Sequence, residues 1–238
     1  MNKFPSSFVG RKMPNDTKFA WSYSSLRAFE TCPWRYYLTR VSKEVIEPET
    51  EVLKWGNEVH KVFEEYVKNN GEYDAPDWFE RWRPIADKIL SKPGDIHVEY
   101  EAAITEDLTP CGWWDNEVWC RGKFDVVIVD GATATILDYK TGNRKLDNDQ
   151  LKLFALLGFI HFPQVDEIKT GYIWLKSGKL DTEVYQRGQA KELWPEFIHR
   201  VERMRHAFEN AKWPKNQCGL CRSWCPVPNK LCTFSGRL

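Results

Sequence analysis

Two strand-like runs separated by a short turn constrain the fold of this chain more than any other feature. Residues 121–130 include four consecutive β-branched apolar residues, from Val126 to Val129, and residues 134–137 form a second apolar run. Residues 130–133 between them have the length and the glycine of a hairpin turn. The sequence therefore predicts two consecutive strands, paired through a hairpin and buried in a sheet.

The second run leads into residues 137–142, which read Leu-Asp-Tyr-Lys-Thr-Gly. Asp138 and Lys140 are two residues apart, so on a strand both side chains point to the same face. A carboxylate beside an ammonium group can hold a metal ion and steer a charged substrate or a water molecule next to it. A solvent-exposed ion pair at a strand end is the alternative, and the spacing taken by itself favours that alternative.

Further acids lie in the neighbouring strand-like segments. Asp125 directly precedes the apolar run of the first strand, and residues 97–104 alternate enough to predict another strand with Glu99 and Glu101 on one face. The three strands are expected to end in these acids. Carboxylates gathered in core-forming segments repel one another and resist burial unless a cation compensates them. The segments therefore predict a cation site.

Two helices are predicted around these strands. Asn148 or Asp149 can cap a helix that runs from Gln150 to about residue 162. Another helix is expected over residues 54–69, where His60 lies at the edge of an apolar stripe formed by Val59, Val62, Phe63, Tyr66 and Val67. A single histidine in that position is more often a hydrogen-bonded core residue than a metal ligand.

Length and charge limit the class of protein. The 238 residues predict one large domain, or one domain with a small appendage, and residues 1–19 are expected to form a flexible arm. No run of apolar residues is long enough for a transmembrane helix and no signal region is present at the start, so we expect a cytoplasmic protein. The 34 basic and 34 acidic residues argue against a general nucleic-acid coat protein, whose whole surface would be basic. They do not exclude a nuclease with a local acidic metal site.

The carboxyl-terminal tail is rich in cysteine. It contains Cys218, Cys221, Cys225 and Cys232. In a cytoplasmic protein such a run predicts metal binding rather than disulfides, and thiolates select zinc or iron–sulfur clusters. The spacing alone does not choose between these metals. Two other cysteines, Cys111 and Cys120, lack such a context and are expected to be ordinary thiols.

The chain resembles the PD-(D/E)XK nuclease superfamily, and within it the RecB-type branch that includes CRISPR-adaptation and phage recombination exonucleases. The motifs that carry the resemblance follow the order of the family: residues 23–37, residues 55–60 with the histidine, Gly122-Lys-Phe-Asp125, Asp138-Tyr-Lys140-Thr-Gly, and Gln150. The resemblance runs from about Ser22 to Cys232. The chain departs from it at Phe154, where the family usually has a tyrosine.

The resemblance implies an α/β fold with a restriction-endonuclease-like core, in which helices flank a central mixed sheet. Residues 20–212 would form the nuclease domain and residues 213–238 a cysteine-rich, metal-binding appendage that joins the two ends of the chain. The implied function is that of a metal-dependent DNA exonuclease in recombination, repair or phage DNA processing. A CRISPR-adaptation nuclease and a catalytically inactive module that binds DNA ends are the alternatives. The substrate would be single- or double-stranded DNA ends, with a recombination or annealing protein as a candidate partner and no membrane association, in a bacterium or a phage-infected host.

The resemblance also assigns roles to individual residues. The catalytic residues would be Asp125, Asp138, Lys140 and Gln150. The ligands of Mg²⁺ or Mn²⁺ would be His60, Glu99, Asp125, Asp138 and the backbone carbonyl of Tyr139. Glu101 is the alternative to Glu99, and the length to Ile104 favours Glu99. The residues expected to contact DNA phosphates are Arg121, Lys123, Arg144 and Lys145.

For the cysteines, the resemblance favours an iron–sulfur cluster. RecB-type nucleases that carry a cluster take one cysteine from before the nuclease core and three from after it. This arrangement implies a 4Fe-4S cluster with the ligands Cys32, Cys221, Cys225 and Cys232, and Cys218 as the alternative to Cys221. A zinc ion held by the four tail cysteines is the competing scheme. A cluster that ties the two ends of the chain together would stabilise the fold rather than take part in hydrolysis.

Overall fold

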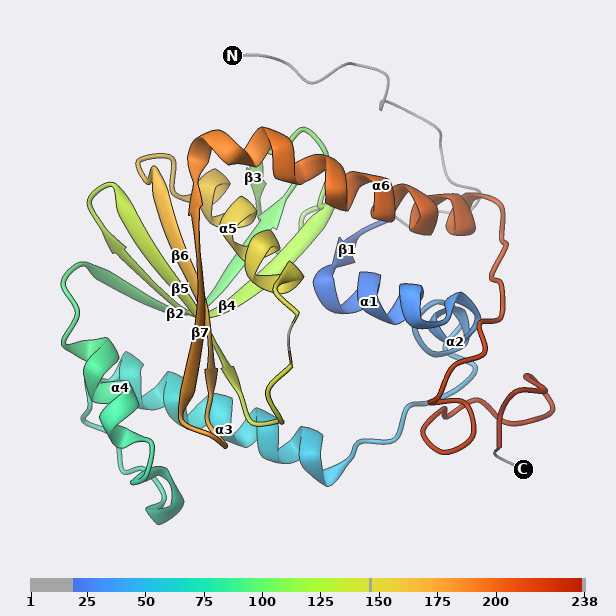
Figure 1. The fold of residues 1–238 in the computed structure, drawn as a ribbon, viewed down its shortest axis with the longest axis horizontal. Coiled ribbons are helices and arrows are strands. Elements are labelled where there is room, and N and C mark those ends of the chain that lie inside the picture. Colours follow the sequence, from blue (N-terminus) through green and yellow to red (C-terminus); the bar gives the residue numbers. More distant parts are fainter. Residues whose placement is uncertain (1–18, 146, 237–238) are drawn as a thin grey trace.

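The computed structural model describes residues 19–145 and 147–236, so the predicted arm lies outside the described residues except for Phe19. In the described part of the chain, seven strands form one sheet in the order β3-β2-β4-β5-β6-β7, and β1 pairs with β4. Figure 1 shows helices on both faces of this sheet, with α3 and α4 below it and α5 and α6 above it. The predicted α/β fold, with helices flanking a central mixed sheet, is confirmed.

The strands are β1 (Trp21–Ser22), β2 (Asp95–Ile104), β3 (Pro110–Cys111), β4 (Cys120–Asp130), β5 (Thr133–Lys140), β6 (Glu167–Trp174) and β7 (Lys179–Gln186). The helices are α1 (Tyr23–Thr31), α2 (Pro33–Tyr36), α3 (Glu51–Lys68), α4 (Arg83–Leu90), α5 (Asp149–His161) and α6 (Ala190–Glu209). None of the described helices combines the length and the apolar character that crossing a membrane requires.

The predicted hairpin joins β4 to β5. Strand β4 ends at Asp130 and β5 begins at Thr133, and the turn between them contains Gly131 at a φ of 58°. Because this φ lies in the left-handed region, glycine suits the position. Strands β2, β4 and β5 pair antiparallel, whereas β5 and β6 pair parallel and are connected by α5. The sheet is therefore mixed, as expected.

Helices α3 and α5 differ from their predictions mainly at their first turns. Helix α3 begins at Glu51 instead of Lys54, because the Thr50 hydroxyl accepts a hydrogen bond from the Leu53 amide at 3.2 Å and caps the helix earlier. Its apolar stripe is buried as predicted. Helix α5 begins at Asp149, but Asn148 makes no side-chain capping bond; the Asp147 carboxylate accepts from the Asp149 amide instead, at 3.2 Å.

The sheet is irregular at one level of β2 and β4. In β4, Phe124 packs in the core beneath α5 and Val126 packs in the core beside α3, although residues two apart in a regular strand share a face. The pairing of β2 with β4 is likewise interrupted between the Val98–Val126 pair and the Tyr100–Phe124 pair. The two residues at this gap are Glu99 and Asp125. The sequence predicted that these acids end their strands, but both lie in the middle of a strand.

The two ends of the described chain pack against each other. Figure 1 shows the carboxyl-terminal tail beside α2, and both lie at one side of the sheet. The Trp34 indole donates to the Leu231 carbonyl at 3.0 Å, and the Trp34 amide donates to the Pro214 carbonyl at 3.2 Å. Leu38 is buried in a small apolar cluster with Val227. The tail is therefore docked on the segment that follows Cys32.

The close packing of α5 on the sheet generates a prediction about Gly158. A Cβ atom at this position would lie 2.8 Å from the Cδ1 atoms of both Ile136 and Ile168. We expect Gly158→Val to lower the free energy of unfolding by about 1–3 kcal/mol, because the added methyl groups would overpack the core. Urea unfolding measures the change. Gly188→Val is the control, since a Cβ there meets nothing within 4 Å. Equal losses in the two variants would contradict this account of the packing.

Candidate active site

Strands β4 and β5 diverge at the centre of the sheet. Their ladder runs from Asp130–Thr133 to Val126–Leu137 and stops there. Two residues beyond Leu137, the Tyr139 amide donates to the Asp125 carboxylate at 2.7 Å rather than to a carbonyl of β4. Because a side chain takes the place of the β4 backbone, the two strands separate, and the side chains of Asp125 and Asp138 lie at the opening.

The first group of functional side chains lies between α3 and the irregular part of β2 and β4. His60 from α3, Glu99 from β2 and Asp125 from β4 bring their ligand atoms within 4.8 Å of one another. His60 Nδ1 lies 3.1 Å from Asp125 Oδ1. Burial would lower the pKa of His60, but the hydrogen bond and the negative charge of Asp125 outweigh burial and raise it. Glu101 is exposed, so of the two predicted candidates Glu99 is the one that joins this group.

The backbone at Glu99 supports a specialised role for this residue. Its φ is 50°, in the left-handed region that residues other than glycine adopt only when the surrounding structure requires it. Lys123 Nζ lies 2.5 Å from Glu99 Oε2, so the carboxylate already has a positive partner. The strained backbone turns Glu99 out of the ladder toward His60.

The second group lies on the other side of the opening. Lys140 Nζ is 2.6 Å from Asp138 Oδ2 and donates to Gln150 Oε1 at 3.2 Å. Gln150 Nε2 donates in turn to Asp138 Oδ1 at 3.1 Å. Asp138 Oδ2 is buried, and the Lys140 ammonium group is the charge that compensates it. The Gln150 amide thus links both members of the predicted pair to the first turn of α5.

Asp138 is the most strongly perturbed acid of the site. Burial and the negative charge of Asp125 raise its pKa to about 6, and Lys140 offsets only part of that rise. A buried carboxylate that faces another carboxylate is stabilised by a cation between them. Carboxylate oxygens suit Mg²⁺, and the imidazole of His60 suits a softer ion such as Mn²⁺. The donor set therefore fits a divalent cation.

An open cleft gives access to the first group. It has a volume of about 680 Å³, and its walls include Gly56, His60, Glu99, Asp125 and Thr141. The exposed side chains of Val52 and Leu53, in the first turn of α3, lie at its edge. The volume of the cleft lies within the roughly 300–1,000 Å³ typical of ligand pockets.

The four basic residues expected to contact DNA have different surroundings. The guanidinium group of Arg144 makes two hydrogen bonds to the Asp181 carboxylate, at 2.7 and 2.6 Å. Arg121 donates to the Trp113 carbonyl at 2.8 Å, and Lys123 pairs with Glu99. Lys145 is exposed. Arg144 therefore has a structural role in holding the loop after β5 against β7, and its proposed contact with DNA has no further support.

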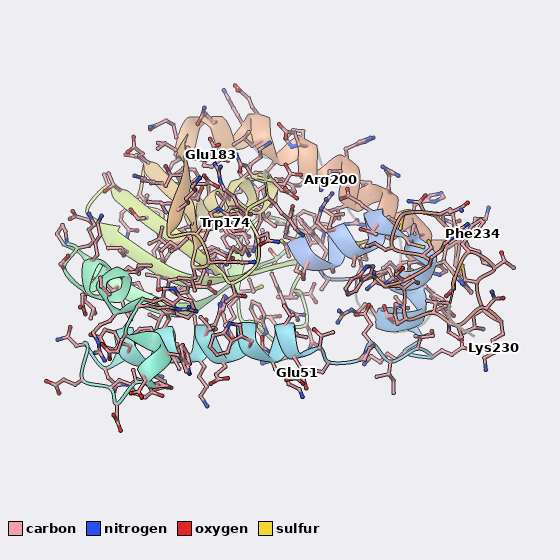
Figure 2. All side chains as sticks on the ribbon, turned by 60° about the horizontal axis from the view of Figure 1, so that its bottom comes forward. Glu51, Trp174, Glu183, Arg200, Lys230 and Phe234 are labelled. Carbon is pink, nitrogen blue, oxygen red and sulfur yellow. The ribbon has the colours of Figure 1, made fainter. Side chains whose placement is uncertain are left out.

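Sequence reasoning missed one residue that positions the site. Arg200 on α6, labelled in Figure 2, donates to both carboxylate oxygens of Glu30 at 2.7 and 2.9 Å. It also donates to the Asp149 carboxylate at 2.6 Å. Asp149 directly precedes Gln150, so Arg200 connects the first turn of α5 to α1. Because these partners lie 170 and 51 residues away in the sequence, no local pattern could have revealed the network.

The predicted cysteine ligands converge at the other side of the molecule. One small cavity is lined by Cys32, Cys218, Cys221, Cys225 and Cys232. All except Cys218 are buried, and Cys218 Sγ lies 3.9 Å from Cys221 Sγ. Among the described residues, three or more candidate ligand atoms lie within 4.8 Å of one another only around His60, so no three of these thiols are that close together. Thiols from both chain ends around a shared cavity fit a thiolate-bound metal group.

Comparisons with known proteins agree with the motifs. A family model described as "PD-(D/E)XK nuclease superfamily" matches residues 20–229. None of the curated proteins compared with the chain matches it. A crystal structure of a protein from Eubacterium rectale, named "Putative exonuclease", is 13% identical with a TM-score of 0.49, and the match covers 86% of each chain. The crystal structure of SSO0001 is 12% identical with a TM-score of 0.36 and 78% coverage of each chain.

The raised pKa of Asp138 predicts how the stability of the metal-free protein depends on pH. An unfolded aspartate has a pKa of about 3.9, whereas the folded value is about 6. Between these values the folded state binds more protons, so stability should fall as the pH rises from about 4 to above 6, by on the order of 3 kcal/mol. Because the pKa of His60 is also raised, the folded protein should lose further stability as His60 is deprotonated at higher pH.

Urea unfolding in EDTA across this pH range measures the effect. Asp138→Asn removes the titrating group, so its stability should change much less between pH 4 and 6.5 and should exceed that of the wild type at neutral pH. Asp130→Asn, at an exposed position in the hairpin, is the matched control and should keep the wild-type profile. A wild-type profile in Asp138→Asn would show that Asp138 does not carry the pH dependence.

Proposed function

The chain belongs to the PD-(D/E)XK nuclease superfamily, and on that premise we propose that it is a divalent-metal-dependent deoxyribonuclease that hydrolyses phosphodiester bonds at DNA ends. The observation that carries the proposal is the position of Lys140, whose ammonium group is held by Asp138 and Gln150 at the opening between β4 and β5. The group of His60, Glu99 and Asp125 lies on the other side of the same opening.

The proposed reaction requires a divalent cation, and the residues on one side of the opening are its proposed ligands. His60, Glu99 and Asp125 would hold it, and Asp138 and the Tyr139 carbonyl are the further predicted ligands. When bound, Mg²⁺ or Mn²⁺ supplies charge neutralisation at the phosphate and lowers the pKa of a water molecule. Asp138 lies outside the group that converges within 4.8 Å, because the Gln150 amide holds one of its oxygens. Its proposed role is therefore to hold Lys140 as well as the cation.

Lys140 is the proposed catalytic group of the chain. Its ammonium group would donate hydrogen bonds to the attacking water and to the phosphate oxygens, on which negative charge develops during hydrolysis. We assign it this positioning and charge-stabilising role rather than that of a general base, because an ammonium group must lose a proton before it can accept one. Asp138 holds the ammonium group of this side chain at 2.6 Å.

Gln150 is the proposed positioning residue. Its amide oxygen accepts from Lys140 at 3.2 Å and from the Tyr172 hydroxyl at 3.4 Å, and its amide nitrogen donates to Asp138. These bonds fix the lysine and the aspartate relative to α5 at the same time. A module that binds DNA ends without cleaving them would not require this arrangement, which favours an active enzyme over an inactive one.

The specificity for DNA ends and the biological role are also proposals. Residues 23–37 and 55–60 resemble RecB-type exonucleases, and this resemblance supports an exonuclease of DNA recombination, repair or phage DNA processing. The substrate is then a DNA end, and a recombination or annealing protein is the candidate partner. A role in CRISPR adaptation would use the same active-site residues.

Substitutions at the two central residues test the proposed chemistry. Asp138→Asn and Lys140→Ala should each lower the rate of cleavage of end-labelled DNA in Mn²⁺ by about 100-fold or more. Asp138→Asn removes the negative charge that holds Lys140 and the cation, and Lys140→Ala removes the positive charge aimed at the reacting phosphate. Lys140→Ala should still bind Mn²⁺ in calorimetric titrations. The control is Lys230→Ala, a change of the same type in the tail. Cleavage by either active-site variant at the rate of the wild type would refute the assignment. When EDTA removes the divalent metal, the unchanged protein should not cleave DNA.

For the tail, we propose that Cys32, Cys221, Cys225 and Cys232 hold a 4Fe-4S cluster with a structural role. The support is that these four thiols are the buried ones around the cavity, whereas Cys218 is partly exposed. The cluster would tie α1 and α2 to the tail.

Single cysteine variants separate the two metals. Protein purified without oxygen should be brown and contain iron and labile sulfide, and Cys32→Ala should lose both together with much of its thermal stability. Cys218→Ala should keep the colour, and Cys111→Ala is a control outside the cavity. Colourless protein that contains zinc, tolerates Cys32→Ala and fails with Cys218→Ala would establish the zinc scheme instead.

A further inference from the structure

An exposed tryptophan lies in the loop between β3 and β4, the strand that carries Asp125, and we propose that Trp114 is a stacking platform for an unpaired base of the DNA substrate. The enzyme would accordingly prefer single-stranded DNA ends. This inference rests on the proposed nuclease function and adds the class of substrate to it.

Trp114 lies at the tip of a well-defined turn. The Asp115 amide donates to the Gly112 carbonyl at 3.0 Å, and the Asp115 carboxylate accepts from the Glu117 amide at 2.9 Å. Turn tips usually carry small or polar residues, yet here an indole ring is 84% exposed. The turn is held by its own hydrogen bonds, so the ring is presented to solvent on an ordered support.

Arg121 joins this turn to β4. It donates to the Trp113 carbonyl at 2.8 Å, and its guanidinium carbon lies 5.6 Å from the ring centre of Trp113 and 5.5 Å from that of Trp114. The contact with two aromatic rings orients the positive charge and leaves it next to the exposed indole. An aromatic face beside a cation is the combination with which proteins bind single strands, because the ring takes the base and the cation takes the backbone phosphate.

The platform and the active site lie along one strand. Arg121 and Lys123 occupy alternate positions in the part of β4 before the irregularity, so their side chains point to the same face. At about 3.3 Å per residue, Arg121 lies roughly 13 Å along the strand from Asp125. Lys123 lies between them and lines the same cleft as Asp125. A DNA strand with one phosphate at Asp125 would thus pass two cationic side chains before its bases reach Trp114.

Four tryptophans, Trp78, Trp82, Trp113 and Trp114, stand among polar residues in the sequence, and three of them are used within the fold. Trp82 is buried, and its indole donates to the Leu175 carbonyl at 3.1 Å. The ring of Trp78 packs against that of Trp55 with 4.8 Å between centroids. Trp113 is partly buried against Arg121. Trp114 is therefore the member of this set with a ring face available to a ligand.

The exposed ring favours an unpaired base over a base pair. In the interior of a duplex both faces of each base are covered by its neighbours, so a side chain can stack there only by separating them. A single strand offers base faces to an aromatic ring without that cost, and it does so for every base, which suits an enzyme that removes nucleotides without regard to sequence.

The test measures binding of fluorescently labelled oligothymidylates of increasing length by anisotropy, in EDTA so that no cleavage occurs. Wild-type protein should bind more tightly once the strand is long enough to reach from the cleft to Trp114. Trp114→Ala should lose this increment, with about tenfold weaker binding of long strands, and Trp114→Phe should retain most of it. The control is Trp224→Ala, which removes a tryptophan of the tail that is 73% exposed.

A blunt duplex of the same length distinguishes the outcomes. We expect Trp114→Ala to leave its binding unchanged. Equal weakening for duplex and single strand, or wild-type binding of single strands by Trp114→Ala, would overturn the inference. Because the readout is binding in EDTA, a failure of the nuclease assays would not produce either result. In the catalytic assay, the variant should show a raised KM for single strands with an unchanged kcat.

Discussion

The hydrogen bond from the Tyr139 amide to the Asp125 carboxylate is the interaction on which the active site depends. It replaces a rung of the ladder between β4 and β5, so the strands separate without leaving the Tyr139 amide unpaired. The same carboxylate has its other oxygen beside His60. Asp125 therefore has two roles. It separates β4 from β5, and it connects His60 on α3 to the opening where Asp138 and Lys140 lie.

The electrostatics of the opening explain why a cation is expected there. Asp138 is buried, faces Asp125 and has a raised pKa, and Lys140 compensates only part of its charge. The strained backbone of Glu99 brings a further carboxylate to the neighbouring group. Proteins tolerate such concentrations of negative charge at sites where a ligand supplies the opposite charge. In the metal-free protein the repulsion between these carboxylates lowers the stability of the fold. A bound cation would raise the stability again.

The site is supported from outside the sheet. Arg200 connects Glu30 at the end of α1 to Asp149 at the start of α5, and Gln150 follows directly. Cys32 lies two residues after Glu30 and lines the cavity of the tail cysteines. The docking of the chain ends and the placement of Gln150 therefore share one helix, α1. Loss of the tail site is expected to loosen the segment that holds α5, in addition to its effect on global stability.

The sequence by itself determined the local features of this protein. Alternation placed Asp138 and Lys140 on one face, the β-branched runs with their glycine turn predicted the hairpin, and the 3.6-residue period gave the buried stripe beside His60, because these patterns depend only on neighbours in the chain. Only the tertiary structure decided that Glu99 and Asp125 leave their ladder in mid-strand, that Arg144 is held by Asp181, and that Arg200 supports α5. Each of these depends on contacts between segments distant in sequence. Periodicity reports which face a side chain occupies, but not whether a strand diverges from its neighbour or which distant charge pairs with it.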